Sequence, residues 1–128
     1  MTDYTDETLK NKLTEEQFNI LRKAATEPPF SGEFDDFWQS GVYACAACGN
    51  KLFKSETKYD AGCGWPSFWN AVDDTKIKLI DDDTHGMNRT EVRCGICNSH
   101  LGHLFDDGPV EHGKKRYCIN SGALDFEK

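Results

Sequence analysis

Two Cys-x-x-Cys pairs constrain this chain more than any other feature of its sequence. Cys45 pairs in this way with Cys48, and Cys94 pairs with Cys97. Two such pairs supply the four thiolates of a tetrahedral zinc site, and four thiolates leave no open coordination position. We therefore predict one structural zinc ion. The segment 49–93 between the pairs is longer than the spacer of a simple zinc ribbon, so we expect the domain to be built around the site. The alternative is a set of incidental or redox-active dithiols.

Length and charge narrow the class of protein. The chain has 128 residues, the size of one hydrophobic core, so we assign residues 1–128 to a single domain. Its formal net charge of −7 argues against general nucleic-acid binding, which needs a basic face. No stretch approaches the roughly 20 apolar residues of a membrane span, and the polar N-terminus is not a signal peptide. We expect a cytoplasmic monomer, in which cysteines are metal ligands or reactive thiols rather than structural disulfides.

Residues 1–29 have the pattern of a helical N-terminal arm. Thr14 and Gln17 have the spacing of a capping box, in which each side chain bonds the other residue's backbone amide. Apolar residues follow at helical spacing, and Pro28 and Pro29 end the segment.

Residues 41–126 have the alternation typical of β-strands. The sequence predicts strands near 41–44, 48–53, 77–80, 89–93, 103–105, 116–119 and 123–126. Residues 81–86 read as a polar turn, and residues 66–72 as one helical turn. The predicted fold is mainly β, with two small antiparallel sheets around a core that zinc cross-links, and with the short helical arm attached.

The two remaining cysteines stand alone, and Cys118 has polar neighbours at strand spacing. Arg116 and Asn120 lie two residues before and after it, so they share its strand face. A guanidinium beside a thiol favours the nucleophilic thiolate. A lone strand cysteine is nevertheless most often a small hydrophobic residue of the core, and these three residues alone leave that interpretation open.

The segment 99–103 carries two histidines, His100 and His103. Their spacing is one residue more than strand alternation allows, which indicates a loop or a bulge. Histidine near a thiolate can donate or accept a proton near neutral pH. One of the two could instead be a zinc ligand or an ordinary exposed histidine, although four cysteines already complete a zinc shell.

The second lone cysteine, Cys63, lies between two glycines, which suits a mobile and exposed thiol. Trp65, Phe68 and Trp69 follow and could form an aromatic wall for a sulfur-bearing group. The alternative is that these rings are plain core packing.

Together these motifs resemble those of a known family. Residues 62–68, 91–94, 99–105 and 116–121 closely resemble the B-type methionine sulfoxide reductases, which reduce the R epimer of methionine sulfoxide, free or in proteins. The resemblance spans roughly residues 13–126. It implies an oxidoreductase in which Cys118 is the nucleophile and Cys63 resolves the resulting sulfenic acid as a disulfide. Thioredoxin would then reduce that disulfide.

The resemblance also implies roles for the residues around the two thiols. His100 and His103 would bind and protonate the sulfoxide oxygen, and Asn120 would position it. Trp65 would pack on the substrate methyl group, and Arg116 would support the thiolate. The four paired cysteines match the zinc ligands of the family.

The sequence motifs are also compatible with two rival functions. A non-enzymatic binding module cross-linked by zinc would not need the surplus pair Cys63 and Cys118. A thiol redox sensor would need reactive thiols but no pocket for a methyl sulfoxide, and Trp65 with the two histidines argues against it.

Overall fold

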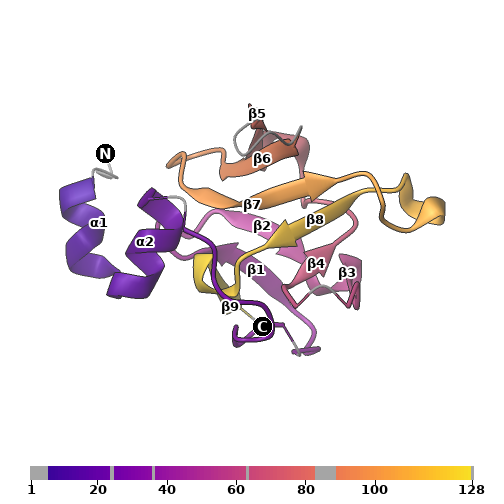
Figure 1. Cartoon of the computed structure of the whole chain (residues 1–128). Coiled ribbons are helices and arrows are strands. Elements are labelled where there is room, and N and C mark those ends of the chain that lie inside the picture. Colours follow the sequence, from indigo (N-terminus) through magenta and orange to yellow (C-terminus); the bar gives the residue numbers. More distant parts are fainter. Residues whose placement is uncertain (1–5, 24, 36, 63, 83–88, 128) are drawn as a thin grey trace.

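The computed structural model describes residues 6–23, 25–35, 37–62, 64–82 and 89–127. Two short helices, α1 (Asp6–Lys12) and α2 (Glu15–Lys23), lie side by side at one end of the molecule, and two β-sheets joined by loops and 3₁₀ turns follow (Figure 1). In the described part of the chain, no helix is long and apolar enough to cross a membrane.

The capping box predicted between the helices is confirmed. The backbone amide of Gln17 donates to Thr14 Oγ1 at 3.1 Å, and the amide of Thr14 donates to Gln17 Oε1 at the same distance. The amide groups at the start of α2 are thereby partly satisfied. Leu21 and Ile20 bury the inner face of α2, which packs on β7 and on the 3₁₀ turn Ser121–Ala123.

All strand pairings of the two sheets are antiparallel. The smaller sheet has the order β2-β1-β9, with the bounds Lys51–Lys54, Val42–Cys45 and Leu124–Glu127. The larger sheet has the order β3-β4-β8-β7-β6-β5, with the bounds Lys58–Tyr59, Ser67–Phe68, Arg116–Ile119, His100–Phe105, Arg89–Cys94 and Ile77–Asp82. The C-terminal strand therefore returns beside β1, and the site-bearing strands β7 and β8 lie inside the larger sheet.

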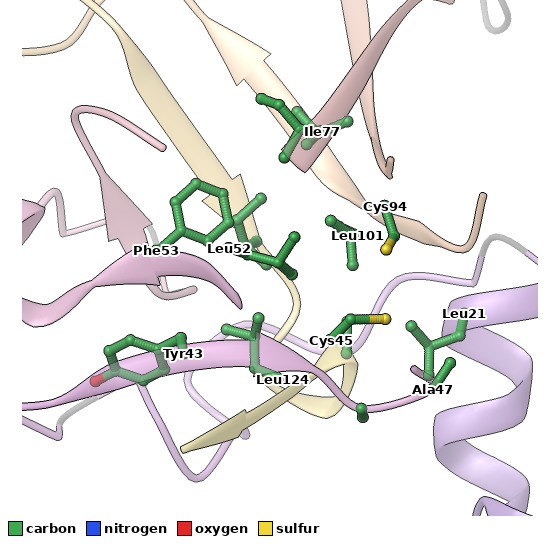
Figure 2. Packing of buried hydrophobic residues seen from close by; sticks show 14 of the residues in the cluster. Leu21, Tyr43, Cys45, Ala47, Leu52, Phe53, Ile77, Cys94, Leu101 and Leu124 are labelled. Atoms are coloured by element: carbon green, nitrogen blue, oxygen red, sulfur yellow. The ribbon is translucent and has the colours of Figure 1, made fainter. Parts of the chain in front are cut away.

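The hydrophobic core lies between the two sheets (Figure 2). Tyr43, Leu52 and Phe53 of the smaller sheet and Leu101 of the larger one belong to this cluster, and none of these four side chains is exposed. Phe53 also stacks on Phe68 of β4, with ring centroids 4.5 Å apart.

The predicted fold class is confirmed: the chain is mainly β, with two antiparallel sheets and few helices. The helical turn predicted over residues 66–72 is wrong. Ser67 and Phe68 instead form β4, which pairs with β3 on one side and β8 on the other. The flanking strands satisfy the backbone of these residues, so the local helical preference is overridden. Of the predicted turn 81–86, Asp81 and Asp82 extend β5, and the remaining four residues lie outside the described part of the chain.

Candidate active site and metal centre

Cys118 lies near the middle of β8, on the face that turns away from the core. Its neighbours Tyr117 and Ile119 are buried, and side chains alternate along a strand, so Cys118 points to the opposite face. Directly across from it are His103 on β7 and Ser67 on β4. Cross-strand partners of this kind share one face of the sheet. The fold therefore places the thiol and His103 side by side.

A pocket of about 250 Å³ opens over this face. Five residues singled out in the sequence line it: Trp65, His103, Arg116, Cys118 and Asn120. Arg116, Cys118 and Asn120 do share one side, as alternation predicted. The pocket has the size of a side chain rather than of a whole peptide, so a macromolecular substrate would enter it with one residue.

Gly102 lines the pocket and allows β7 and β8 to approach closely there. A Cβ atom at this position would lie 2.0 Å from the carbonyl oxygen of Cys118. Any side chain would therefore push the two strands apart and separate His103 from Cys118.

His100 lies behind His103 rather than in the pocket wall. The pairing of β6 with β7 shifts register between Val92 and Arg93, because Leu101 has no partner of its own. This extra residue is the predicted bulge, and it brings both histidines to the same face, with ring centroids 5.5 Å apart. His100 is buried, and its Nδ1 atom lies 2.7 Å from Glu91 Oε2.

Arg116 is held at the rim of the pocket by two partners. Its Nε and one terminal nitrogen donate to the carboxylate of Asp107 at 2.7 and 3.2 Å. Its guanidinium also lies 4.3 Å from the ring centroid of Phe105. The hydrogen bonds from Arg116 hold the pKa of Asp107 below its usual range. Arg116 and Cys118 line the same pocket, so this positive charge lies beside the cavity that the thiol faces.

Trp65 and Asn120 are both fixed by the backbone of Glu27, which lies in the arm after helix α2. The indole nitrogen of Trp65 donates to the Glu27 carbonyl at 2.9 Å, and the Glu27 amide donates to Asn120 Oδ1 at 3.1 Å. The Asn120 side-chain nitrogen also donates to the carbonyl of Leu101 at 3.0 Å. The arm therefore sets the position of two pocket walls.

Cys63 lies outside the described residues, but the glycines on both sides of it are described. Gly62 and Gly64 both adopt left-handed backbone conformations, with φ of 70° and 92°. Gly62 lines a second hollow together with Asp107 and Arg116, and Arg116 also lines the Cys118 pocket. The chain on the N-terminal side of Cys63 thus adjoins the pocket rim.

The four paired cysteines lie together and could hold a metal ion. Their sulfur atoms all lie within 4.8 Å of one another. Cys45 and Cys97 are 3.7 Å apart at their sulfurs, and Cys48 and Cys94 are 3.5 Å apart. Cys45 ends β1 and Cys94 ends β6, so the cluster connects the two sheets (Figure 2).

The electrostatics of this cluster favour a bound cation. Hydrogen bonds from Cys45 and Cys48 lower the pKa of Cys97 to about 6. The pKa of Cys45 is raised instead, and its hydrogen bond with Cys48 is the largest cause. Four adjacent thiols cannot all ionise to thiolates unless a positive charge lies between them. Further polar groups surround the sulfurs: Asn50 donates to Cys94, and the hydroxyl of Ser99 lies 3.0 Å from the sulfur of Cys97.

Several residues of the site were not predicted from the sequence. Four of them line the pocket: Thr26, Arg89, Gly102 and Phe105. Two others, Glu91 and Asp107, are hydrogen-bond partners of site residues. For Glu91 a signal existed, because Glu91 and Arg93 place opposite charges on one face of a strand that leads to a paired cysteine. For Asp107 no local signal existed, because its ion pair with Arg116 closes only when the β7–β8 hairpin forms.

Comparison with solved structures identifies the fold. The crystal structure of the Mis18 'Yippee-like' domain is similar to 70% of this chain and 97% of that domain, with a TM-score of 0.56. Its sequence identity of 17% supports a shared fold and nothing more.

Sequence comparison is more specific. A sequence profile of the SelR domain matches residues 13–128. A peptide methionine sulfoxide reductase MsrB from Leifsonia xyli subsp. xyli is 52% identical over 123 residues, which cover 96% of this chain and 88% of that protein. Proteins with the same name from Burkholderia pseudomallei and Thioalkalivibrio sulfidiphilus are 51% and 50% identical over similar shares. With the profile matching nearly its whole length, this chain belongs to the SelR domain family, the B-type methionine sulfoxide reductases.

Proposed function

We propose that this protein reduces the R epimer of methionine sulfoxide to methionine, with Cys118 as the nucleophile. The observation that carries the proposal is the pairing of Cys118 with His103 across two strands, in a pocket that Trp65 and Arg116 also line. A thiol, a proton-transfer group, an aromatic wall and a fixed cation are the parts that sulfoxide reduction needs.

In the first step the Cys118 thiolate attacks the sulfoxide sulfur. The sulfoxide oxygen takes up a proton, and oxygen transfer leaves methionine and a sulfenic acid on Cys118. The methionine sulfur is reduced by two electrons and the cysteine sulfur is oxidised by two. Oxygen leaves readily only when it is protonated, so a proton donor must lie within hydrogen-bond reach. His103, directly opposite Cys118, has the position for this role.

In the second step the Cys63 thiol condenses with the sulfenic acid. A Cys63–Cys118 disulfide forms and water leaves. An external dithiol must then reduce this disulfide by thiol–disulfide exchange, and we propose thioredoxin as that partner. The left-handed glycines beside Cys63 support a chain path that brings this thiol towards the pocket.

The four paired cysteines would hold a structural zinc ion. A Zn–S distance of about 2.3 Å in a tetrahedron separates the sulfurs by about 3.8 Å. The separations of 3.7 and 3.5 Å agree with that geometry, and an all-thiolate set is a common structural zinc shell. The ion would cross-link the two sheets and take no part in the reaction.

Single-turnover assays of two cysteine variants test the proposal. Cys118→Ser should form no methionine even with excess reductant, because only Cys118 contacts the sulfoxide sulfur. Cys63→Ser should still form about one equivalent of methionine and then stop with thioredoxin, because it lacks the resolving thiol. Stoichiometric methionine from Cys118→Ser would refute the assignment of the nucleophile. Full thioredoxin-dependent turnover by Cys63→Ser would show that another group resolves the sulfenic acid.

Resolved R and S substrates test the stereochemistry. The site distinguishes the three substituents on the sulfur if Trp65 packs on the methyl group and the polar side chains of the pocket bind the oxygen. The other epimer would leave buried polar groups unpaired, which commonly costs about 10⁴-fold or more in kcat/KM. Equal rates on the two epimers would contradict this arrangement.

A further inference from the structure

Glu91 makes two close contacts in the larger sheet, and both involve the side chain's carboxylate. Its Oε2 atom lies 2.7 Å from His100 Nδ1, and its Oε1 atom lies 2.9 Å from a terminal nitrogen of Arg93. Glu91 is 8% exposed and His100 is 5% exposed. A contact of this length between buried groups is a strong and specific hydrogen bond.

The charge states of the pair follow from their surroundings. Burial opposes ionisation of Glu91, but hydrogen bonds from Arg93 and His100 outweigh it, so the pKa of Glu91 lies below its ordinary value. Burial lowers the pKa of His100, although the hydrogen bond with Glu91 and the negative charge of Glu91 raise it. Near neutral pH the pair is therefore a carboxylate and a neutral imidazole.

A neutral imidazole carries one ring proton, and its partner decides where that proton sits. A carboxylate can only accept, so His100 must donate from Nδ1 to Glu91. The other ring nitrogen, Nε2, is then left with a lone pair. It is buried and has no hydrogen-bond partner among the described residues, so it remains available as an acceptor.

The bulge connects this acceptor to the pocket. Glu91 is the direct cross-strand partner of His103, and His103 is the partner of Cys118. Because the extra residue in β7 brings His100 to the same face, the His100 ring lies 5.5 Å from that of His103, at an interplanar angle of 68°. Glu91, His100 and His103 thus form one connected group beside the thiol, in which Glu91 and His100 are buried and His103 is half-buried.

We propose that Glu91 is a positioning residue for the reaction: it fixes His100 as the Nδ1–H tautomer, so that Nε2 presents a lone pair within the His100–His103 pair. His100 then serves as a hydrogen-bond acceptor that orients His103, or a water molecule between them, and not as a proton donor to the sulfoxide. The role for catalysis rests on the function proposed above, whereas the tautomer does not.

The tautomer can be observed directly in the zinc-loaded full chain. The protein has four histidines, so ¹⁵N-histidine labelling gives a small set of ring signals in a long-range ¹H–¹⁵N correlation spectrum. The signal that is absent from a His100→Gln variant belongs to His100. We expect it to show a protonated Nδ1 and a bare Nε2 at neutral pH, although imidazole in water prefers the opposite tautomer.

Glu91→Gln tests the positioning role. An amide can donate to Nδ1 as well as accept from it, so the variant should admit the Nε2–H tautomer. We expect a loss in kcat of roughly 10- to 100-fold, by analogy with the loss seen when the hydrogen-bond partner of a metal-ligating histidine is removed. KM for the sulfoxide should change less than kcat. The matched control is Glu56→Gln, the same substitution at an exposed site, which should alter neither tautomer nor rate.

The outcomes separate this inference from the proposed function. A wild-type His100 with a protonated Nε2 overturns the inference, even if the enzyme turns over and even if Glu91→Gln does not fold. A changed tautomer in folded Glu91→Gln with unchanged kcat also overturns the positioning role. If the wild-type chain has the expected tautomer but reduces no sulfoxide, the proposed function fails while the assigned tautomer stands.

Discussion

Glu27 shows how much one residue of the connecting segment contributes to the site. Its amide and carbonyl groups hold Asn120 and Trp65, and its Oε1 atom accepts the amide of Gly122 at 2.9 Å. The carboxyl is nearly inaccessible, and its Oε2 atom has no hydrogen-bond partner among the described residues. Burial therefore raises the pKa of Glu27 above its ordinary value of 4.5, despite the hydrogen bonds from the backbone.

The raised pKa predicts a specific pH dependence for Glu27→Gln. Because the folded chain binds this proton more tightly than the unfolded chain, the contribution of Glu27 to stability falls as the pH rises above 4.5. The amide that replaces the carboxyl in the variant does not titrate. The wild-type free energy of unfolding should therefore drop relative to that of the variant as the pH rises to about 7. Denaturant unfolding of both proteins at each pH measures this difference. A constant difference would mean that Glu27 has an ordinary pKa.

At the scale of elements, the two N-terminal helices hold the two cysteine turns. The Nζ atom of Lys12, the last residue of α1, donates to the carbonyl of Ala47 at 2.7 Å. Arg22 of α2 donates to the carbonyl of Cys97 at 2.9 Å and to Ser99 Oγ at 3.0 Å. Helices of this length are marginal alone, so these contacts and the packing of α2 on β7 keep the arm in place. Beyond α2, the arm reaches the pocket at Glu27, which bonds Asn120 and Trp65.

Thr14→Ala tests the contribution of the capping box. The variant loses the bond from the Gln17 amide and leaves an unsatisfied donor at the start of α2. The free energy of unfolding should fall by about 1 kcal/mol. Thr14→Ser keeps the hydroxyl and should lose much less. Equal loss in both variants, measured by denaturant unfolding, would mean that the methyl group rather than the cap is important.

At the scale of the molecule, the cysteine cluster connects the sheets and the arm. One cysteine pair follows β1 of the smaller sheet, the other follows β6 of the larger sheet, and α1 and α2 each bond to one of these turns. Every layer of the fold therefore meets at this cluster.

Removal of the metal should unfold the domain rather than merely inactivate it. Structural zinc sites contribute about 10–16 kcal/mol of binding free energy, which matches or exceeds the roughly 5–15 kcal/mol stability of a typical domain. We expect one zinc per chain by metal analysis, and loss of the folded circular dichroism spectrum after chelation or in Cys45→Ser. A metal-free preparation with an unchanged spectrum and thermal midpoint would contradict this prediction.

Local sequence signals determined a large part of this structure. The Cys-x-x-Cys spacing located the cysteine cluster, because each pair needs only its own turn to bring two sulfurs together. The capping box of Thr14 and Gln17 closes within four residues. Strand alternation placed Arg116, Cys118 and Asn120 on one side, since that periodicity is a property of the strand itself.

Only the tertiary structure decided which residues meet across strands. The spacing of His100 and His103 indicated a loop or a bulge, but not that Glu91 would be the partner of His100, because that depends on the register of β6 against β7. Residues 66–72 gave no strand signal, and β4 exists because β3 and β8 flank it. Contacts of this kind join segments far apart in the chain, so no local pattern encodes them, and the packing of the whole domain selects them.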